Sequence, residues 1–494
     1  MKIKTIQDIN KRVAADFLVI PYIESKKVLK PLCDITKFKK YISAPISTHD
    51  FLGKEKSISM VYTKSKDKRI ILLGFGSIEK LDSLIISEVY AELVKFLKSQ
   101  KAASVNIIMP QDLNIEDEVL IQTILESLIL SSYSFNKFKN FSKKDEPVYL
   151  KEITLIGIEK EFSNLVNKTK HLCDGVNLTR DLVNNNAYEE TPEHLALTAK
   201  ELEKISDNLK VTLFDKKRIE KEKMGLLLAV NQGSDKDPVF IIVEYKGDPS
   251  SDEVSAIVGK GITYDTGGLS LKPTLSMDTM KADMAGAAAI LGTMYTIANL
   301  KLKVNVTALI PATENSIGSK AYKPGDVYIS MANKSVEVKN TDAEGRLILA
   351  DALYYAATVV KPKRIIDLAT LTGACVVALG EDIAALFSNN EDLAESLLKA
   401  SSESKDVLWR MPLYKDYLKI LKSDIADIRN VGTVREAGAI TAALFLHEFI
   451  DNIAWAHIDI AGPAYLNAPK SIHPTNATGV GVRLLTKFFE KLSK

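Results

Sequence analysis

Short hydrophobic runs alternate with segments of helical periodicity through the first 150 residues. Two of these segments, around 81–98 and 117–131, repeat their apolar residues at the spacing of a helix with one buried face. The remaining runs are short and rich in isoleucine, leucine and valine, as buried strands are, and comprise DFLVIPYI, RIILLGFGS and ASVNIIMP. The alternation predicts a small N-terminal α/β domain.

A polar stretch at 137–147 interrupts this pattern. It has no hydrophobic period and is predicted to be a linker. Beyond it we expect a strand over 152–158 and helices over 161–184 and 191–207.

From about residue 210 strand-like runs again alternate with helical segments. The runs are KVTLF, PVFIIVEY, VSAIVG, VNVTALIP, RIIDLAT, IAALFS and WAHIDIAG. This order is typical of a mostly parallel sheet flanked by helices. The expected fold class is therefore α/β with two domains, an N-terminal domain at 1–150 and a larger domain at 151–494.

The composition fits a folded chain with more than one core, because 46% of the 494 residues are hydrophobic and 26% are charged. Disordered and fibrous classes are excluded, and no repeat supports a solenoid. Cys33, Cys173 and Cys375 lie far apart without a CxxC pair, which indicates neither a disulfide framework nor a cysteine zinc site. A reducing compartment fits this cysteine usage.

The N-terminus has no features of a targeting segment. Its basic residues are interrupted by Asp8 and Asn10 before any apolar core of signal-peptide length. No apolar run approaches the roughly 18 residues of a membrane span. We expect a soluble, cytoplasmic protein with no membrane partner.

The net charge of +2 argues against a surface built throughout for nucleic acid. Residues 1–70 nevertheless carry 16 lysines and arginines against 7 acidic residues, which leaves a net −7 for the remainder. A nucleic-acid-binding role for residues 1–70 is thus an alternative hypothesis. A solvated lysine-rich face is the favoured interpretation, because no aromatic interleaving or basic helix motif accompanies the charge.

Several familiar catalytic motifs are absent. Tyr264 occupies the place of the third glycine in a dinucleotide fingerprint, and neither a P-loop nor a G-x-S-x-G elbow occurs. His447 and Glu448 begin like a zincin helix, but Asp451 stands where the second histidine is needed. Cys375 has no histidine near it in sequence, so a buried structural thiol is favoured over a nucleophile.

The first cluster of candidate functional residues lies in the stretch 254–291. A β-branched run ends in a loop that holds Lys260, Asp265 and a glycine pair, and a helix is expected to follow, with Asp283 near its start. A carboxylate beside a buried helix face is costly unless a cation or hydrogen-bond donors compensate. The apolar positions of this helix step by four and three residues and are Met280, Met284, Ala287, Leu291, Met294 and Ala298.

The second cluster is NTDAEGRL at 340–347, which also follows a strand-like run and opens a helix. Side chains at such junctions meet at the carboxyl ends of parallel strands. Four carboxylates with no adequate basic neighbours would converge there, and their repulsion calls for divalent cations. Oxygen ligands suit Mn²⁺ or Mg²⁺ and do not exclude Zn²⁺. Two-metal carboxylate sites also cleave phosphate esters, so a phosphoesterase is an open hypothesis. The four acids are Asp265, Asp283, Asp342 and Glu344.

At these segments the chain resembles the leucyl aminopeptidase family of dinuclear metallo-aminopeptidases, also called the cytosol aminopeptidase family. NTDAEGRL matches the signature octapeptide of the family, and VGKGITYDTGG with LKPTLSMDTMKADMAGAAA resembles its other metal segment. Further matches within about 150–490 are TRDLVN, DLATLTGA, SDIAD, AGAITAALFLHEF, WAHIDIAG and ATGVGVR. The first 150 residues match no motif, although an N-terminal α/β domain of that size is usual in the family.

The resemblance implies two divalent ions per subunit, Mn²⁺ or Zn²⁺. The tightly held ion would have as ligands Lys260, Asp265, Asp283 and Glu344. The exchangeable ion would have Asp265, Asp342 and Glu344. Both ions would activate one bridging water.

The resemblance also implies two catalytic residues. Lys272 would stabilise the oxyanion of the tetrahedral intermediate. Arg346 would hold a bicarbonate that takes the proton of the bridging water, so that no histidine base is needed. The bicarbonate would also contact the backbone amides of Ala343, Gly345 and Leu371.

The implied reaction is hydrolysis of the first peptide bond of a peptide with a free N-terminus. A leucine- or methionine-like preference is implied for the first residue, with core packing as an equal alternative for the pocket positions. The substrate-binding positions are Met280, Thr370, Leu371, Gly373 and Ala461. Asn185 stands where the family usually has proline, and Pro463 follows a strand in a variable region. The family assembles as a hexamer of two trimers, and the resemblance implies the same assembly here.

Overall fold

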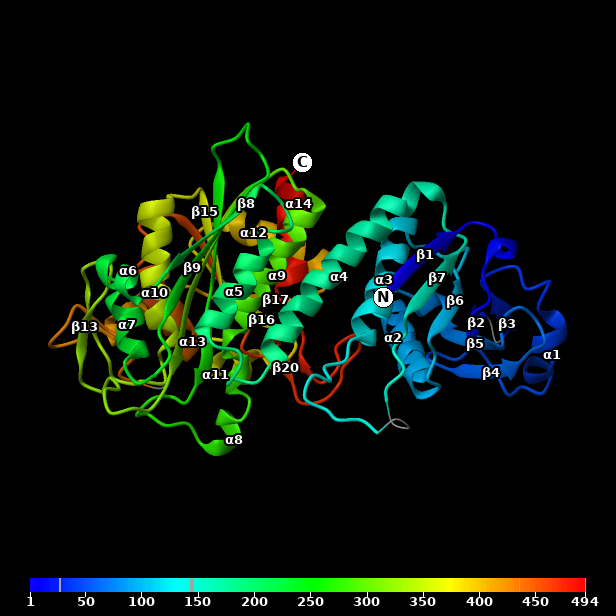
Figure 1. Ribbon diagram of the computed structural model, residues 1–494, viewed down its shortest axis with the longest axis horizontal. Coiled ribbons are helices and arrows are strands. Elements are labelled where there is room, and N and C mark those ends of the chain that lie inside the picture. The colour runs from blue at the N-terminus through cyan, green and yellow to red at the C-terminus, as the bar shows by residue number, and fades with distance from the viewer. Residues whose placement is uncertain (26–27, 143–145, 435, 494) are drawn as a thin grey trace. The chain divides into compact units, whose positions relative to one another are not determined.

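A computed structural model of the chain describes residues 1–25, 28–142, 146–434 and 436–493 (Figure 1). The hydrophobic runs of the N-terminal part form one sheet of seven strands. The order is β1 (Lys2–Ile6), β7 (Glu152–Ile156), β6 (Ser104–Ile108), β2 (Phe17–Ser25), β5 (Arg69–Ser77) and β4 (Ile58–Tyr62), with β3 (Val28–Pro31) paired to β2. In this spatial order, all neighbouring strands from β1 through β5 are parallel. At the edges, β4 pairs antiparallel with β5, and β3 pairs antiparallel with β2.

Helices cover both faces of this sheet, which explains why its strands are continuous hydrophobic runs. Strand β5 alternates between two hydrophobic clusters. Ile71 and Leu73 pack with residues of α2 (Ser83–Ser99) and α3 (Asp117–Ser132). Ile70 and Leu72 pack on the other side with residues of α1 (Lys39–Ser47).

The chain divides into two compact units. The first comprises Met1–Cys173 and Ala468–Pro474, and the second comprises Asp174–Asn467 and Thr475–Lys494. The sequence suggests a domain limit at residue 150, after a linker of which residues 143–145 lie outside the described residues. In the structure β7 follows that stretch and pairs within the first sheet, and the change of unit falls inside α4 (Ser163–Asn184).

The second unit is built on a nine-stranded sheet. Its order is β17 (Leu408–Arg410), β16 (Ala384–Ser388), β19 (Ala454–Asp459), β15 (Arg364–Ala369), β10 (Val254–Gly259), β12 (Asn305–Asn315), β9 (Val239–Lys246) and β8 (Leu209–Phe214), with β11 (Gly261–Asp265) paired to β12. The central strands β19, β15, β10 and β12 are parallel. Antiparallel pairing occurs only outside this centre, at β16·β19, β12·β9 and β8·β9 among the described residues.

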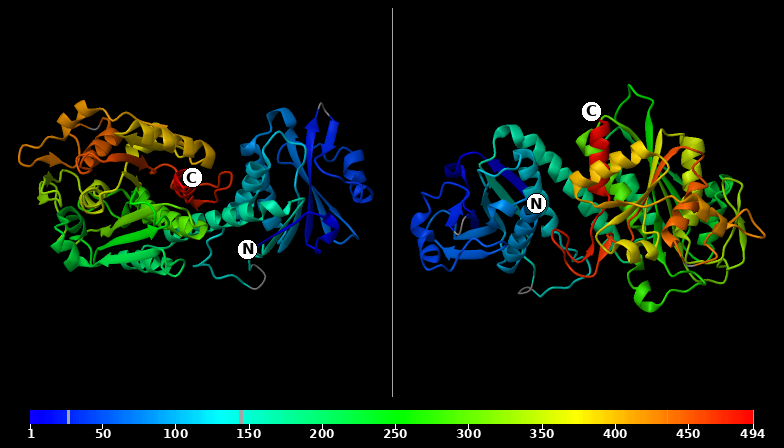
Figure 2. Two further views of the ribbon diagram at one scale, coloured as in Figure 1. Left: turned by 90° about the horizontal axis from the view of Figure 1, so that it is seen from above. Right: turned by 180° about the vertical axis from the view of Figure 1, so that it is seen from behind.

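Helices flank this sheet as well (Figure 2). One hydrophobic cluster joins residues of β10 and β15 with α7 (Gly225–Asn231), α10 (Gly345–Tyr355) and α13 (Gly438–His447). Helix α9 (Ala285–Leu300) also packs on β10 and β15, and α14 (Val482–Leu492) packs on α9. The two sheets confirm the predicted α/β class with mostly parallel strands flanked by helices.

Shorter elements complete the second unit. Its remaining helices are α5 (Pro192–Leu202), α6 (Lys216–Lys221), α8 (Thr274–Met277), α11 (Gly373–Leu379) and α12 (Glu391–Ser404), and its small sheets are β13 (Val327–Ile329) with β14 (Ser335–Glu337) and β18 (Ile428–Arg429), and β20 (Tyr465–Leu466) with β21 (Asn476–Ala477). Across both units, short 3₁₀ or π segments occur at Ile9–Lys11, Ile78–Lys80, Lys160–Phe162, Met280–Met284, Ala356–Val360 and Lys415–Leu421.

The candidate residues follow strands that run in the same direction. Lys260 comes directly after β10, Asp265 ends β11, and Thr370 comes directly after β15. The carboxyl ends of parallel strands lie at one edge of a sheet, which is where open α/β sheets place their sites. Residues from distant parts of the sequence therefore meet there.

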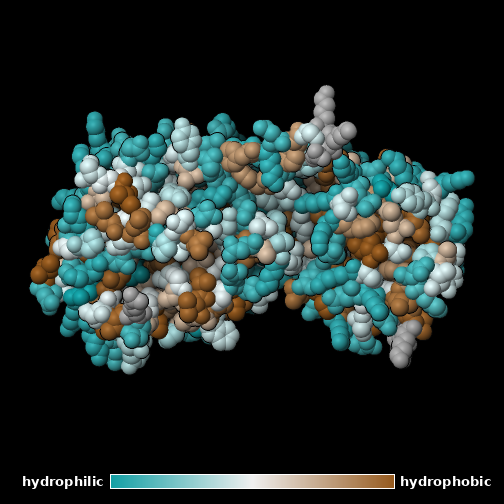
Figure 3. Space-filling view, turned by 90° about the horizontal axis from the view of Figure 1, so that it is seen from below, coloured by the Kyte–Doolittle hydropathy of each residue, from teal (hydrophilic) through white to brown (hydrophobic). Residues whose placement is uncertain are grey.

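The surface seen in Figure 3 is mostly hydrophilic, with hydrophobic residues in small separate groups. Within the described residues, every helix is too short or too polar to traverse a bilayer.

Candidate active site and metal centre

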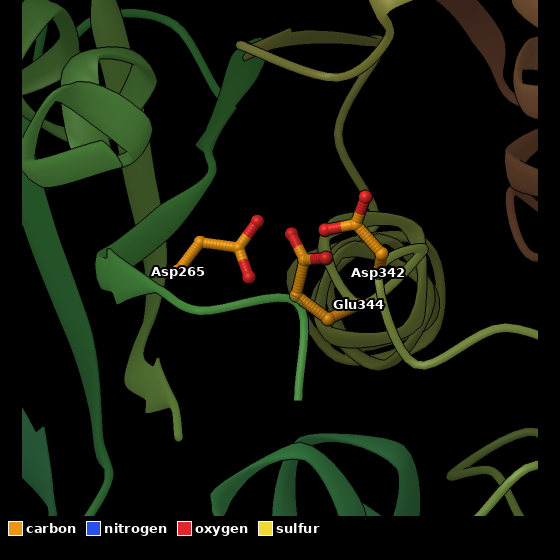
Figure 4. A group of neighbouring side chains, drawn as sticks. All are labelled: Asp265, Asp342 and Glu344. Carbon is orange, nitrogen blue, oxygen red and sulfur yellow. The ribbon is translucent and has the colours of Figure 1, made fainter. Parts of the chain in front are cut away.

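Three carboxylates point toward one another at the end of the central sheet (Figure 4). One oxygen of each of Asp265, Asp342 and Glu344 lies within 4.8 Å of the other two. Asp265 ends β11, whereas Asp342 and Glu344 come from the segment that leads into α10. Asp265 and Glu344 are buried, so their charges need compensation that water cannot supply.

Two lysines provide part of that compensation. Lys260 Nζ lies 2.8 Å from Asp283 Oδ2 and 2.8 Å from Glu344 Oε1. Lys272 Nζ lies 2.9 Å from Asp265 Oδ2 and 2.5 Å from Asp342 Oδ1. The expectation that the four acids lack adequate basic neighbours is therefore wrong. Lys260 lies between β10 and β11 and Lys272 follows β11, and the fold turns both side chains toward the acids.

Burial and charge shift the pKa values of this cluster. Burial alone would lower the pKa of Lys260, but the attraction of Asp283, Glu344 and Asp265 outweighs it and raises that pKa. The same balance raises the pKa of Lys272. Burial raises the pKa of Asp265, and the neighbouring Glu344 raises it further. Both ammonium groups are therefore protonated in this arrangement, and Lys260 must lose its proton before its nitrogen can bind a metal ion.

The cluster retains unsatisfied oxygens that fit a divalent cation. Glu344 Oε2 is buried and has no hydrogen-bond partner among the described residues. Asp283 Oδ2 and Asp342 Oδ1 are also buried without a hydrogen bond of good geometry, although a lysine nitrogen lies near each. Buried carboxylate oxygens without donors are costly, and a divalent ion with oxygen ligands would satisfy them. The residues thus fit the metal centre expected from the sequence.

Glycines give Lys260 the space it needs. A Cβ atom at Gly345, the first residue of α10, would lie 2.6 Å from Lys260 Nζ and 2.8 Å from its Cδ. A Cβ atom at Gly286, in the first turn of α9, would overlap the carbonyl oxygen of Leu368. The two helices approach the lysine and β15 closely only because these positions carry no side chain.

Arg346 is placed to bind an anion. It is buried, its Nη1 donates to the Asn430 carbonyl oxygen at 2.7 Å, and its Nε has no hydrogen-bond partner within the part of the chain that the structure describes. Burial lowers the pKa of Arg346 to about 10, so the guanidinium is still charged at neutral pH. An unpaired buried N–H on a cation suits an anionic ligand.

The backbone amides expected to share that anion are partly engaged. The Leu371 N–H donates to Asp459 Oδ1 at 3.1 Å. The Ala343 N–H donates to the Asn340 carbonyl oxygen at 3.3 Å. An anion beside Arg346 would have to share or displace these two donors.

All of the site residues expected from the sequence line one cavity of about 420 Å³. The cavity belongs wholly to the second unit. The expected residues are Lys260, Asp265, Lys272, Met280, Asp283, Asp342, Ala343, Glu344, Gly345, Arg346, Thr370, Leu371, Gly373 and Ala461. Nine further residues line it without having been anticipated, namely Pro273, Ser276, Thr279, Ala282, Thr372, Val376, Ala464, Tyr465 and Asn467.

Asp459 supports this cavity from the end of β19. It is fully buried and accepts from the N–H groups of Leu371 and Ala461 and from the Thr372 hydroxyl, at 3.1, 3.1 and 2.7 Å. This role of Asp459 was not expected from the sequence. Its signal is a polar residue at every second position of a buried strand, since His457 and Asp459 share one face of β19.

His457 belongs to a separate buried network. Its Nδ1 lies 2.6 Å from Asp367 Oδ1, and Trp455 Nε1 donates to Asp367 Oδ2 at 2.7 Å. His457 and Asp367 are both fully buried. Burial alone would lower the pKa of His457, but the Asp367 carboxylate raises it above its ordinary value.

Two family models match the chain. The model of the cytosol aminopeptidase family catalytic domain matches residues 177–486, and the model of its N-terminal domain matches residues 19–142.

Similar full-length proteins carry the same description. A probable cytosol aminopeptidase of Protochlamydia amoebophila (strain UWE25) is 46% identical over 488 residues, and the match covers 98% of each chain. A probable cytosol aminopeptidase of Chlamydia abortus (strain DSM 27085 / S26/3) is 47% identical over 494 residues, again with 98% of each chain covered.

Solved structures with the same fold include two of the bottromycin maturation enzyme BotP. One superposes with a TM-score of 0.85 at 27% identity and covers 97% of this chain and 99% of that chain. The other, in complex with Mn, has a TM-score of 0.85 at 28% identity and covers 97% of this chain and 100% of that chain.

Proposed function

The chain belongs to the cytosol aminopeptidase family, whose metal-dependent members hydrolyse peptides from the N-terminus, and we propose that it removes leucine or a similar apolar first residue. One observation carries this proposal. Four carboxylates, two lysines and a buried arginine surround a single cavity of about 420 Å³, and several of their polar atoms are unsatisfied. The apolar lining by Met280, Val376 and Ala464 supports the preference for an apolar side chain.

We assign the charged cavity residues to two roles, metal binding and stabilisation of the charge that develops during hydrolysis. We propose that Lys260 and the acids Asp265, Asp283, Asp342 and Glu344 hold two divalent ions. When bound, such ions polarise the scissile carbonyl group and lower the pKa of the attacking water. Mn²⁺ is the favoured ion, since the donors are mostly oxygen atoms and the similar BotP structure is described as a complex with Mn.

Lys272 and Arg346 would act on the charge that develops during hydrolysis. The Lys272 ammonium lines the cavity and, once released from Asp342, can donate to the oxyanion of the tetrahedral intermediate. The free Nε–H of Arg346 can orient a bicarbonate, which accepts a proton from the attacking water and returns it to the leaving amine. The neighbouring amides of Ala343, Gly345 and Leu371 would contribute to this anion site by sharing their donors.

The test is hydrolysis of L-leucine p-nitroanilide by the purified chain with Mn²⁺ and bicarbonate. We expect Lys272→Ala and Glu344→Ala each to abolish hydrolysis while circular dichroism shows a folded protein. The matched control is Lys334→Ala, which removes a lysine ion-paired with Glu448 outside the cavity. Retained activity in both cavity variants contradicts the proposal, and cleavage of p-nitrophenyl phosphate instead of the anilide assigns the site to a phosphoesterase.

We further propose a cytoplasmic homohexamer. The name of the relatives supports the location, and the family resemblance supports the assembly. Light scattering of the purified protein would then give about six times the chain mass of 54.5 kDa. A mass of one or two chains contradicts the hexamer and leaves the proposed reaction untouched.

A further inference from the structure

Asn430 follows strand β18 and continues its pairing with the chain that leads to the active site. Strand β18 pairs parallel with β14, in the register Val336 to Ile428 and Glu337 to Arg429. The Asn430 N–H then donates to the Glu337 carbonyl oxygen at 3.0 Å. The backbone of Asn430 is thus fixed by a small sheet that contains none of the metal-binding acids.

The side chain of Asn430 extends this pairing along the next residues. Its Oδ1 accepts from the Lys339 N–H at 2.8 Å and from the Asn340 N–H at 3.4 Å. Its Nδ2 donates to the carbonyl oxygens of Asn340 at 2.7 Å and Ala343 at 3.4 Å. The amide orientation is determined by these partners, because exchange of oxygen and nitrogen would oppose like groups at every contact.

The same residue also holds Arg346. Its carbonyl oxygen accepts from Arg346 Nη1 at 2.7 Å. Asn430 is fully buried, so water cannot replace any of these bonds. One residue therefore fixes the segment that carries Asp342 and Glu344 at one side and the guanidinium of Arg346 at the other.

We propose that Asn430 is a positioning residue that sets the metal-binding acids Asp342 and Glu344 and the guanidinium of Arg346 in register with each other. This inference rests on the proposed function of those three residues. It assigns a role to a residue just after SDIAD that does not itself line the cavity. Residues that orient metal ligands by hydrogen bonds commonly change metal affinity or activity by about 10–100-fold when replaced.

The informative variant is Asn430→Asp. It keeps the size and one acceptor oxygen, but it places a second oxygen where Nδ2 now donates to the Asn340 carbonyl oxygen at 2.7 Å. We expect Mn²⁺ to bind about 10–100-fold more weakly in calorimetric titration of the full chain after EDTA treatment and dialysis. At saturating Mn²⁺, kcat for L-leucine p-nitroanilide is expected to be at least about tenfold lower with KM nearly unchanged, because Arg346 directly follows the displaced segment and shifts with it.

Asn305 offers a matched control. Its Nδ2 donates to the carbonyl oxygens of Asp248 and Ser251 at 2.9 and 2.7 Å, and its Oδ1 accepts from the Asp248 N–H at 3.1 Å. It is thus a second side-chain amide that clamps a loop, but outside the active-site cavity. We expect Asn305→Asp to lower the melting temperature and to leave the Mn²⁺ affinity and kcat as in the wild type.

The outcomes separate the two proposals. A wild-type chain that neither binds Mn²⁺ nor hydrolyses the anilide overturns the proposed function, and the role of Asn430 with it. An active wild type with Asn430→Asp within about twofold in both Mn²⁺ affinity and kcat overturns the positioning role alone, and so do equal losses in Asn305→Asp. If Asn430→Asp does not fold, the smaller neutral Asn430→Ser is measured by the same criteria.

Discussion

Replacing Lys272 with methionine should have opposite effects on metal binding and on catalysis. The lysine lies 2.9 Å from Asp265 and 2.5 Å from Asp342, and its side chain is only 15% exposed. Removing one partner of a buried ion pair typically costs about 3–5 kcal/mol, because the other charge is left uncompensated. For a unit of this size, that cost lowers the melting temperature in EDTA by about 5–8 °C.

Divalent cations should reverse this loss of stability. Lys272→Met removes a positive charge that competes for Asp265 and Asp342, so we expect Mn²⁺ to bind at least as tightly as in the wild type. The melting temperatures of variant and wild type should then converge at saturating Mn²⁺. The kcat should nevertheless fall by about 10²–10³, as is usual when a donor to an oxyanion is lost.

The assays are differential scanning fluorimetry with EDTA or MnCl₂ and hydrolysis of L-leucine p-nitroanilide. Lys334→Met is the control, because its ion pair with Glu448 at 2.8 Å is 36% exposed at the lysine and solvent-screened. Its effect on stability should stay below about 1 kcal/mol, with full activity. Weaker Mn²⁺ binding in Lys272→Met, or a kcat close to that of the wild type, would refute the reasoning.

Three further predictions concern the metal, the pocket and a buried histidine. EDTA should abolish hydrolysis, MnCl₂ should restore it, and activity that persists after exhaustive chelation would argue against a metal-dependent site. Met280→Phe should reduce kcat/KM for leucine relative to alanine p-nitroanilide by about tenfold through crowding of the pocket, and an unchanged ratio would place Met280 outside it. Because Asp367 raises the folded-state pKa of His457, the pair stabilises the protein below the unfolded pKa of about 6.5, and this contribution disappears as pH rises through the folded value. The melting deficit of His457→Gln should therefore shrink between pH 6 and 9, and a deficit that grows over this range contradicts the assigned direction.

Local pattern was sufficient for the core of the second unit. Runs such as VSAIVG and RIIDLAT became the central strands β10 and β15, since β-branched residues in short runs favour buried parallel strands. The helix predicted to have Asp283 near its start is α9, which begins at Ala285 after a 3₁₀ turn. Its apolar positions are buried from Met284 onward, whereas Met280 is half-buried.

Other elements gave weak local signals. Strand β1 (Lys2–Ile6) alternates lysine with isoleucine and threonine at a partly exposed edge. Helix α1 contains Pro45, which argues against a helix in any local scheme. Both elements are stabilised by tertiary contacts that the sequence pattern does not encode.

Some features of the candidate site could likewise be predicted from the sequence, whereas others could not. The acids were predictable because they stand at strand-to-helix junctions, where side chains converge at the end of a parallel sheet. The supporting roles of Asn430 and Asp459 depend on contacts between residues 84 and 88 positions apart. The lysines likewise reach acids of the later segment, Lys260 pairing with Glu344 and Lys272 with Asp342. Such contacts follow from register and packing, and hydrophobic period alone carries no information about them.

Gly345, the first residue of α10, limits how this protein can be made more heat-resistant. Exchanging a helical glycine for alanine is a standard route to higher thermal tolerance, since it gains about 0.5–1 kcal/mol by reducing the freedom of the unfolded chain. At Gly345 the added methyl group would collide with the side chain of Lys260 and push it away from Asp283 and Glu344. Displacing this buried lysine would cost more stability than the helical substitution gains, so Gly345→Ala is expected to lower both thermal tolerance and activity, and engineering libraries should hold position 345 fixed.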